Sequence, residues 1–194
     1  NENTQISSPI SFARINTANG LPTNLFTSLA LVNKNELWAG TADGGVTILT
    51  LPSGFLPSGI NTLAAGMRVF DLSNGLSGNF VEAVCEDAAG HVWIGTTGGG
   101  VTKVMPAAGK NRNDALNKAV LKKYSTRQGL NYFNVKALLP DREGNMWIGT
   151  DVGLNLYRGE RFLLFDRQDG LINDIVWAVC SDREGNTWLG TNDG

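Results

Sequence analysis

Histidine and cysteine are nearly absent from the sequence, which has one His and two Cys in 194 residues. Metal centres and nucleophilic sites usually need several such side chains at defined spacings. His91 has no Cys or second His near it at ligand spacing, so we expect neither a metal site nor a general base there. The sequence therefore offers no catalytic residue and implies no cofactor.

An excess of positive charge is also absent, because 16 Lys and Arg are opposed by 18 Asp and Glu. This composition argues against binding to nucleic acid or to an anionic membrane surface. No apolar run approaches the roughly 20 residues of a membrane-spanning helix. The polar start, NENTQISSPI, lacks the apolar core of a signal peptide. We expect no membrane contact by this segment, and either a removed export signal or an internal piece of a longer chain.

Glycine and tryptophan are abundant instead, with 24 and five residues. Gly-Leu occurs five times, and in four of these copies a Trp follows the glycine by 18 residues. The shortest unit, 41 residues between two successive tryptophans, has about the length of one four-stranded propeller blade. The four repeated tryptophans are Trp38, Trp93, Trp147 and Trp188.

Each unit predicts four antiparallel strands. The first strand follows Gly-Leu, and a hairpin turn leads to a second strand with the pattern Trp-x-Gly-Thr. A glycine bend precedes the third strand, and the fourth strand closes the unit. The residues predicted to have positive φ in the hairpin turn are Asn35, Gly90, Gly144 and Gly185. The glycines predicted at the bend are Gly44, Gly99 and Gly153.

The fold class predicted from this repeat is all-β, a β-propeller of four-stranded antiparallel blades with about three and a half blades present. Such an arc does not close, so sheet edges stay exposed at both ends. We expect self-association or contact with the remaining blades of a parent chain, and two copies completing each other is an alternative. The predicted parts are an outer strand at 11–15, blade 1 at 20–71, blade 2 at 75–125, blade 3 at 129–166 and an incomplete blade 4 at 170–194.

Several repeated residues have structural explanations. The four tryptophans are expected to pack between neighbouring sheets. A recurring Asp in the hairpin is expected to cap the turn, and His91 occupies a turn position that holds Asn in other copies. The two cysteines are expected to be small buried residues of the first strands. The turn carboxylates are Asp87, Asp141 and Asp182, the Asn equivalents of His91 are Asn145 and Asn186, and the cysteines are Cys85 and Cys180.

Two insertions lengthen the first two units between their third and fourth strands. The segment 51–66 is rich in Pro and Gly and is expected to be a loop. The segment 105–119 is expected to contain a helical turn capped by Asn113 or Asp114. Both are interpreted as tolerated surface additions.

One position of the first strand varies while its neighbours do not. It lies seven residues after each Gly-Leu glycine and holds Thr27, Glu82, Lys136 and Trp177. If these side chains point toward the central channel, they form a polar and aromatic lining suited to a small molecule or an oligosaccharide. The alternative is that they only fill or hydrate the channel.

The unit DREGNMWIGTDVGLNLY, preceded by Gly-Leu and a short strand, resembles the two-component regulator propeller repeat of the periplasmic sensor region of hybrid histidine kinases. The copies that begin at Gly75, Gly129 and Gly170 fit well. The first copy has Val32 in place of the turn Asp, and Phe133 replaces a residue that is polar in the other copies. The resemblance implies ligand sensing, often of carbohydrate, in the periplasm or outside the cell, and no enzymatic activity.

Two other function classes remain open. A protein-interaction scaffold would use one face of the propeller or the inserted loops. A propeller enzyme, such as a lyase or a quinone-dependent dehydrogenase, would need a unique acid–base pair or a residue that stacks on a cofactor, and the sequence shows neither. Three glycines at 98–100 are not followed by the helix that a phosphate-binding loop requires.

Overall fold

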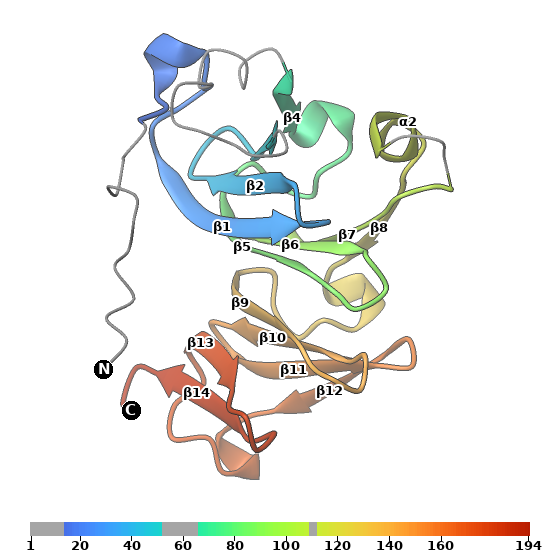
Figure 1. The fold of residues 1–194 in the computed structure, drawn as a ribbon. Coiled ribbons are helices and arrows are strands. Elements are labelled where there is room, and N and C mark those ends of the chain that lie inside the picture. The colour runs from blue at the N-terminus through green and yellow to red at the C-terminus, as the bar shows by residue number, and fades with distance from the viewer. Residues whose placement is uncertain (1–13, 52–65, 109–111) are drawn as a thin grey trace, which may run out of the picture.

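The computed structural model describes residues 14–51, 66–108 and 112–194, and it shows sheets arranged one after another along an arc (Figure 1). Three sheets have four antiparallel strands, and the last has two. Strands follow chain order within each sheet, and the first strands of successive sheets contact one another. These first strands therefore lie along the inner side of the arc. The predicted fold class, a partial β-propeller, is confirmed.

The strands fall close to the repeated sequence pattern. The first sheet consists of β1 (Phe26–Val32), β2 (Glu36–Thr41), β3 (Val46–Thr50) and β4 (Arg68–Phe70). The second consists of β5 (Val81–Glu86), β6 (Val92–Thr96), β7 (Gly100–Met105) and β8 (Val120–Tyr124). The third consists of β9 (Val135–Pro140), β10 (Met146–Thr150), β11 (Gly153–Arg158) and β12 (Arg161–Phe165). The last contains β13 (Val176–Ser181) and β14 (Thr187–Thr191).

Short 3-10 turns that the sequence pattern did not predict precede the Gly-Leu pairs. In three of them, the residue before the turn and the last residue of the turn cap each other's backbone N–H groups. The following glycines adopt left-handed conformations. The turns are η1 (Thr17–Asn19), η4 (Leu72–Asn74), η5 (Thr126–Gln128) and η6 (Arg167–Asp169).

Three of the predicted turn positions are wrong by one or two residues. In the first blade the left-handed residues are Asn33 and Lys34, not Asn35, because two successive left-handed residues form a type I′ turn. The hydrogen bond that closes it, from Asn35 N–H to Val32 O, is equivalent to that from Gly90 N–H to Asp87 O in the second blade. The left-handed bend glycines of the first two blades are Gly45 and Gly100, instead of their predicted neighbours Gly44 and Gly99. The predicted Gly90, Gly144, Gly153 and Gly185 do have positive φ.

The bend glycines also join neighbouring blades. Each donates its backbone N–H to a carbonyl in the loop that enters the next blade. Hydrogen bonds of this kind fix the position of one sheet relative to the next without using side chains. The pairs are Gly45 with Asn79 at 2.9 Å, Gly100 with Phe133 at 2.9 Å and Gly153 with Asp174 at 2.6 Å.

The insertions do lie between third and fourth strands. Helix α2 (Arg112–Asn117) forms in the second insertion. This helix begins at Arg112, so Asn113 and Asp114 lie inside it. The expectation that one of them caps the helix is therefore wrong. The first insertion, 51–66, and the outer strand expected at 11–15 lie mostly outside the described residues.

Two hydrophobic cores fill the junctions between sheets. The first joins blades 1 and 2 around Trp38, Val81 and Ile94, and the second joins blades 2 and 3 around Trp93 and Ile148. Each tryptophan also faces the aromatic ring that ends the outer strand of its own blade. The ring centroids are 6.0 Å apart for Trp38 and Phe70, 5.7 Å for Trp93 and Tyr124, and 5.9 Å for Trp147 and Phe165.

One buried hydroxyl group has no hydrogen-bond partner among the described residues: Thr47 Oγ1, on β3. In the second blade, the equivalent Thr102 Oγ1 accepts a hydrogen bond of 3.0 Å from the backbone N–H of Ser77. Pro22 occupies the position of Ser77 in the first blade and has no N–H to donate. The proline therefore explains the unpaired hydroxyl.

Replacing Thr47 with valine should raise the free energy of unfolding by about 1 kcal/mol, because a buried unpaired hydroxyl costs about 1–3 kcal/mol. The matched change Thr102→Val removes the acceptor of Ser77 and should lower the free energy of unfolding by about 1–2 kcal/mol. Urea denaturation of both variants gives the comparison. An equal loss of stability in the two variants would contradict the explanation based on Pro22.

Candidate functional site

The variable residues of the first strands occupy the same irregularity in every blade. In each pairing of a first and a second strand the register shifts near the start of the first strand, leaving one residue without a direct partner. This arrangement is a β-bulge, which redirects a side chain and is frequent beside binding and active sites. The four unpartnered residues are Thr27, Glu82, Lys136 and Trp177.

Three of these side chains are in contact. The Lys136 ammonium lies 3.0 Å from Glu82 Oε1 on the preceding blade. It also lies 4.9 Å from the centroid of the Trp177 ring on the following blade, within the range of a cation–π interaction. Side chains from β5, β9 and β13 therefore meet in one row, which we call the channel cluster: Glu82, Lys136 and Trp177.

Thr27 has a different role from the other three. Its hydroxyl donates a hydrogen bond to the backbone carbonyl of Val81, which joins the first strands of blades 1 and 2. The structure thus places Thr27 beside the channel cluster but outside its charged contacts. Ligand binding by any of the four residues remains a prediction.

A second variable position supports the channel cluster, and the sequence analysis missed it. The residue that follows Trp-x-Gly-Thr hydrogen-bonds to, or lies near, the bulge residue of its own blade in blades 2, 3 and 4. The recognisable signal was that this residue varies directly after an unchanging Gly-Thr. The pairs are Thr97 Oγ1 to Glu82 Oε1 at 3.0 Å, Lys136 Nζ to Asp151 Oδ1 at 3.9 Å and Trp177 Nε1 to Asn192 Oδ1 at 2.7 Å.

The channel cluster combines a partly buried charged end with an exposed aromatic end. The side chain of Lys136 is only 13% exposed, whereas Trp177 is 51% exposed. Asp151 is held in place by a hydrogen bond of 2.8 Å from Asn134 Nδ2 to its Oδ2. The charged side chains are therefore fixed by several partners, and the indole presents a surface for stacking.

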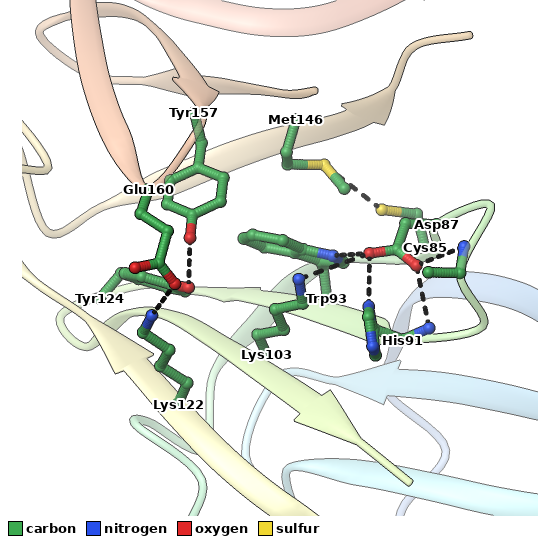
Figure 2. Close-up of polar contacts among 11 residues, drawn as sticks. Cys85, Asp87, His91, Trp93, Lys103, Lys122, Tyr124, Met146, Tyr157 and Glu160 are labelled. Atoms are coloured by element: carbon green, nitrogen blue, oxygen red, sulfur yellow. Dashed lines mark hydrogen bonds and ion pairs between the residues drawn. The ribbon is translucent and has the colours of Figure 1, made fainter. Parts of the chain in front are cut away.

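The junction between blades 2 and 3 contains a second polar cluster around Asp87 (Figure 2). Its Oδ2 accepts a hydrogen bond of 2.8 Å from Trp93 Nε1 and lies 3.0 Å from His91 Nδ1. The Lys103 ammonium lies 3.7 Å from the same oxygen. Partial burial raises the pKa of Asp87, but the hydrogen bonds from Trp93 and His91 together outweigh it, so the pKa is lower than usual.

The same polar arrangement recurs with different residues. Asp182 accepts hydrogen bonds from Trp188 Nε1 and Asn186 Nδ2, which lower the pKa of its carboxyl to about 2. The interpretation of His91 as a turn residue is confirmed, because it interacts with Asp87 as Asn186 does with Asp182. In the first blade, which has no turn Asp, Glu36 Oε2 accepts from Trp38 Nε1 at 3.0 Å.

Three segments of the chain match the family described as Two component regulator propeller: residues 75–98, 129–152 and 170–193. Each begins at a Gly-Leu glycine and contains the hairpin turn and the Trp-x-Gly-Thr strand described above. These three segments are two-component regulator propeller repeats. A comparison with curated proteins found no match.

Solved structures share the fold. The extracellular domain of BT3049 from B. thetaiotaomicron, described as a hybrid two component system, has 25% sequence identity and a TM-score of 0.69, and the match covers 98% of this chain and 23% of that one. This chain therefore spans about a quarter of the length of that domain.

Two more distant structures show likeness of fold alone. Streptogramin B lyase has 12% identity and a TM-score of 0.61, over 90% of this chain and 50% of that one. PorZ, a surface component of the type-IX secretion system of Porphyromonas gingivalis, has 14% identity and a TM-score of 0.56, over 86% of this chain and 24% of that one.

The indoles of the propeller repeats differ in their exposure along the arc. Trp38 and Trp93 are buried at 0% and 2% exposure, and Trp147 is half-buried. Trp188 is 62% exposed, so the expected burial of all four tryptophans is wrong for the last repeat. The reason is that no sheet packs against the β14 side of the last blade in the described part of the chain.

A groove of about 590 Å³ lies on the hairpin-turn side of the last two repeats, away from the channel cluster. It is found between the third sheet and the two strands of the fourth. Completed repeats fill the equivalent space with side chains of their third and fourth strands, such as Tyr157 at the preceding junction. The residues that line it include Arg142, Trp147, Leu156, Arg158 and Thr187.

The two cysteines of the propeller repeats should react differently with a thiol reagent. Cys85 lies 3.9 Å from Met146 Sδ, and burial, aided by Asp87, raises the pKa of its thiol to about 12. Cys85 is half-buried and Cys180 is exposed, so the expected burial of both cysteines is wrong for Cys180 and only partly met by Cys85. In the folded chain at neutral pH, Cys180 should be labelled and Cys85 protected, because the thiolate is the reactive form. Labelling of Cys180→Ser at the wild-type rate would contradict this assignment.

Proposed function

We propose that this chain is the ligand-sensing part of an extracellular or periplasmic receptor in two-component signalling. The repeats and the likeness to the extracellular domain of BT3049 support this assignment. In the described residues, no helix is long and apolar enough to cross a membrane. The receptor's signalling output would come from parts beyond this segment.

The ligand we propose is a small molecule or an oligosaccharide bound at the channel cluster. The observation that carries this proposal is the recurrent bulge, which places a variable residue of each first strand so that Glu82, Lys136 and Trp177 meet. A sugar ring can stack on the exposed indole while its hydroxyl groups donate to the nearby carboxylates. Thr27 would complete the same lining on the first blade.

The test compares two exposed tryptophans of the same blade. Trp177→Ala removes the stacking surface. It should therefore weaken the binding of the oligosaccharide that the unmodified chain binds most tightly by at least tenfold, about 1.4 kcal/mol. Trp188→Ala removes an indole that is similarly exposed and also hydrogen-bonded, but lies outside the channel cluster. Isothermal titration calorimetry of the full chain with a panel of neutral and acidic oligosaccharides measures both.

Glu82→Ala provides a second test at the channel cluster, since it removes the carboxylate that holds Lys136. Affinity that is unchanged in both Trp177→Ala and Glu82→Ala would overturn the channel site. An equal loss of affinity in Trp188→Ala would show that the effect is not specific to the cluster.

A protein-interaction scaffold is the second candidate, and the apolar ends of the arc favour it. Leu29 on β1 is 65% exposed, whereas the equivalent residue of β5, Val84, is buried in the same hydrophobic core as Trp38. The first end therefore fits a strand that bears a tryptophan, such as β14 of a second copy or another blade of the parent chain.

Light scattering at micromolar concentration should show self-association of the chain. A pull-down with and without residues 51–66 tests whether the inserted loop binds a partner. A chain that stays monomeric would argue against association through the exposed apolar ends of the arc.

We propose no catalytic activity, cofactor or nucleic-acid partner for this chain. The likeness to streptogramin B lyase is one of fold, at 12% identity. Within the described residues, His, Cys, Asp and Glu form no group that could hold a metal ion. His91 is engaged in its hairpin turn by Asp87.

A further inference from the structure

We infer that the channel cluster selects uncharged sugars and rejects acidic ones. This inference rests on the proposed function, since it assigns a ligand class to the same site. It depends on the charges of the cluster and on which of its groups are already paired.

The charges of the channel cluster and its supporting residue Asp151 sum to −1. Glu82 and Asp151 are opposed by one cation, Lys136, whose ammonium lies 3.0 Å from the first carboxylate and 3.9 Å from the second. The side chains of all three are at most 28% exposed, so water screens their charges only partly. A uronate or sulfate group entering this site would meet net repulsion.

The only cation of the cluster is also fully engaged. Lys136 Nζ contacts Glu82 and Asp151 and lies over the Trp177 ring, and its side chain is 13% exposed. An acidic ligand would have to displace one of these carboxylates, which would leave a partly buried charge without its partner. The lysine therefore does not act as an anion receptor, although its charge alone would suggest one.

Uncharged hydroxyl groups match the groups that remain. The carboxylates can accept further hydrogen bonds, since each oxygen has two acceptor sites. Trp177 is 51% exposed, and its Nε1 is already satisfied by Asn192, so its ring face is what a ligand meets. A neutral pyranose supplies both hydroxyl donors and an apolar face for stacking.

The experiment uses pairs of oligosaccharides that differ only in oxidation at C6. β-1,4-mannohexaose is compared with β-1,4-hexamannuronate, together with the corresponding gluco- and galacto-configured pairs, by calorimetry on the full chain. The neutral member of the best-binding pair should bind at least about tenfold more tightly, as expected for like-charge repulsion in a partly screened site. The ratio should shrink as salt is raised.

A charge-changing double variant tests the cause. Glu82→Gln with Asp151→Asn changes the summed charge of the channel cluster and Asp151 from −1 to +1, and the neutral-to-acidic affinity ratio should fall at least tenfold. Glu143→Gln with Glu184→Gln makes the same change in net charge at the hairpin turns, at the opposite ends of the strands, and should leave the ratio unaltered. Equal shifts in both double variants would mean that overall charge, and not the cluster, sets the preference, which would overturn the inference.

Trp177→Ala separates the inference from the proposed function. If the acidic sugar binds as tightly as the neutral one and Trp177→Ala weakens both, the inference is wrong and the sensing site stands. If no member of the panel binds, or if binding is indifferent to Trp177→Ala, both the site and its selectivity are overturned.

Discussion

Replacing Trp93 with alanine should lower the free energy of unfolding by about 3–5 kcal/mol, the range for large aromatic residues in cores. The indole is 2% exposed and lies between blades 2 and 3, stacked on Tyr124 with centroids 5.7 Å apart and edge-on to Tyr157 at 5.3 Å. Its loss also removes the 2.8 Å hydrogen bond to Asp87, as Figure 2 shows. Urea denaturation followed by circular dichroism measures the change.

The control for this prediction is built into the repeat. Trp188 holds the same sequence position and makes the same hydrogen bond to Asp182, but it is 62% exposed. Trp188→Ala should cost less than about 1 kcal/mol, because little apolar surface is buried there. Similar losses in the two variants would mean that the indole acts within its own blade and does not join neighbouring blades.

The regular part of the fold was predictable because each unit repeats the same local code. Apolar alternation, turn residues and the 18-residue spacing from Gly-Leu to Trp act over short distances and specify strands and their order. The four copies also support one another, because an atypical residue in one copy does not change a strand assignment on which the other copies agree. The strands and the propeller architecture followed from this alone.

The atypical hairpin of the first blade was not predicted, because one residue there takes over the role of another at a different position. The first blade has Val32 in place of the turn Asp, and the sequence pattern gave no reason to assign its role to Glu36, which hydrogen-bonds to Trp38. The hairpin turn of that blade has the same length as the others, but its left-handed residues are Asn33 and Lys34. A change of turn type moves such positions without altering the hydrophobic pattern.

The channel cluster was predicted in composition but not in arrangement. Variation at one position of the repeat identified Glu82, Lys136 and Trp177. Structural positions keep similar residues in every copy of a repeat, whereas positions of a binding surface vary between copies. Their mutual contacts depend on the bulge and on the spacing of neighbouring blades, which no single unit encodes. The supporting residues Asp151 and Asn192 directly follow the fixed Trp-x-Gly-Thr motif, and the sequence analysis assigned them no role.

Replacing Gly95 with alanine should lower the free energy of unfolding by about 2–3 kcal/mol, in the range for overpacking a well-filled core. A Cβ at this position would lie 2.5 Å from Val135 Cγ1 of the next blade. Gly95 has no positive φ, so the cost comes from the close approach of two blades and not from the backbone. Thermal and urea denaturation measure the loss.

The matched control and a double variant identify the cause. Gly190 has the same place in the last blade, where the nearest atom to an added Cβ is Ala178 Cβ at 3.4 Å, so Gly190→Ala should change stability by less than about 0.5 kcal/mol. Val135→Ala removes the methyl groups that the new Cβ would meet. The combined cost of Gly95→Ala and Val135→Ala should therefore be at least about 1 kcal/mol less than the sum of the single costs. Strict additivity would show that the glycine serves its own strand, because only contact between the two blades can couple these positions.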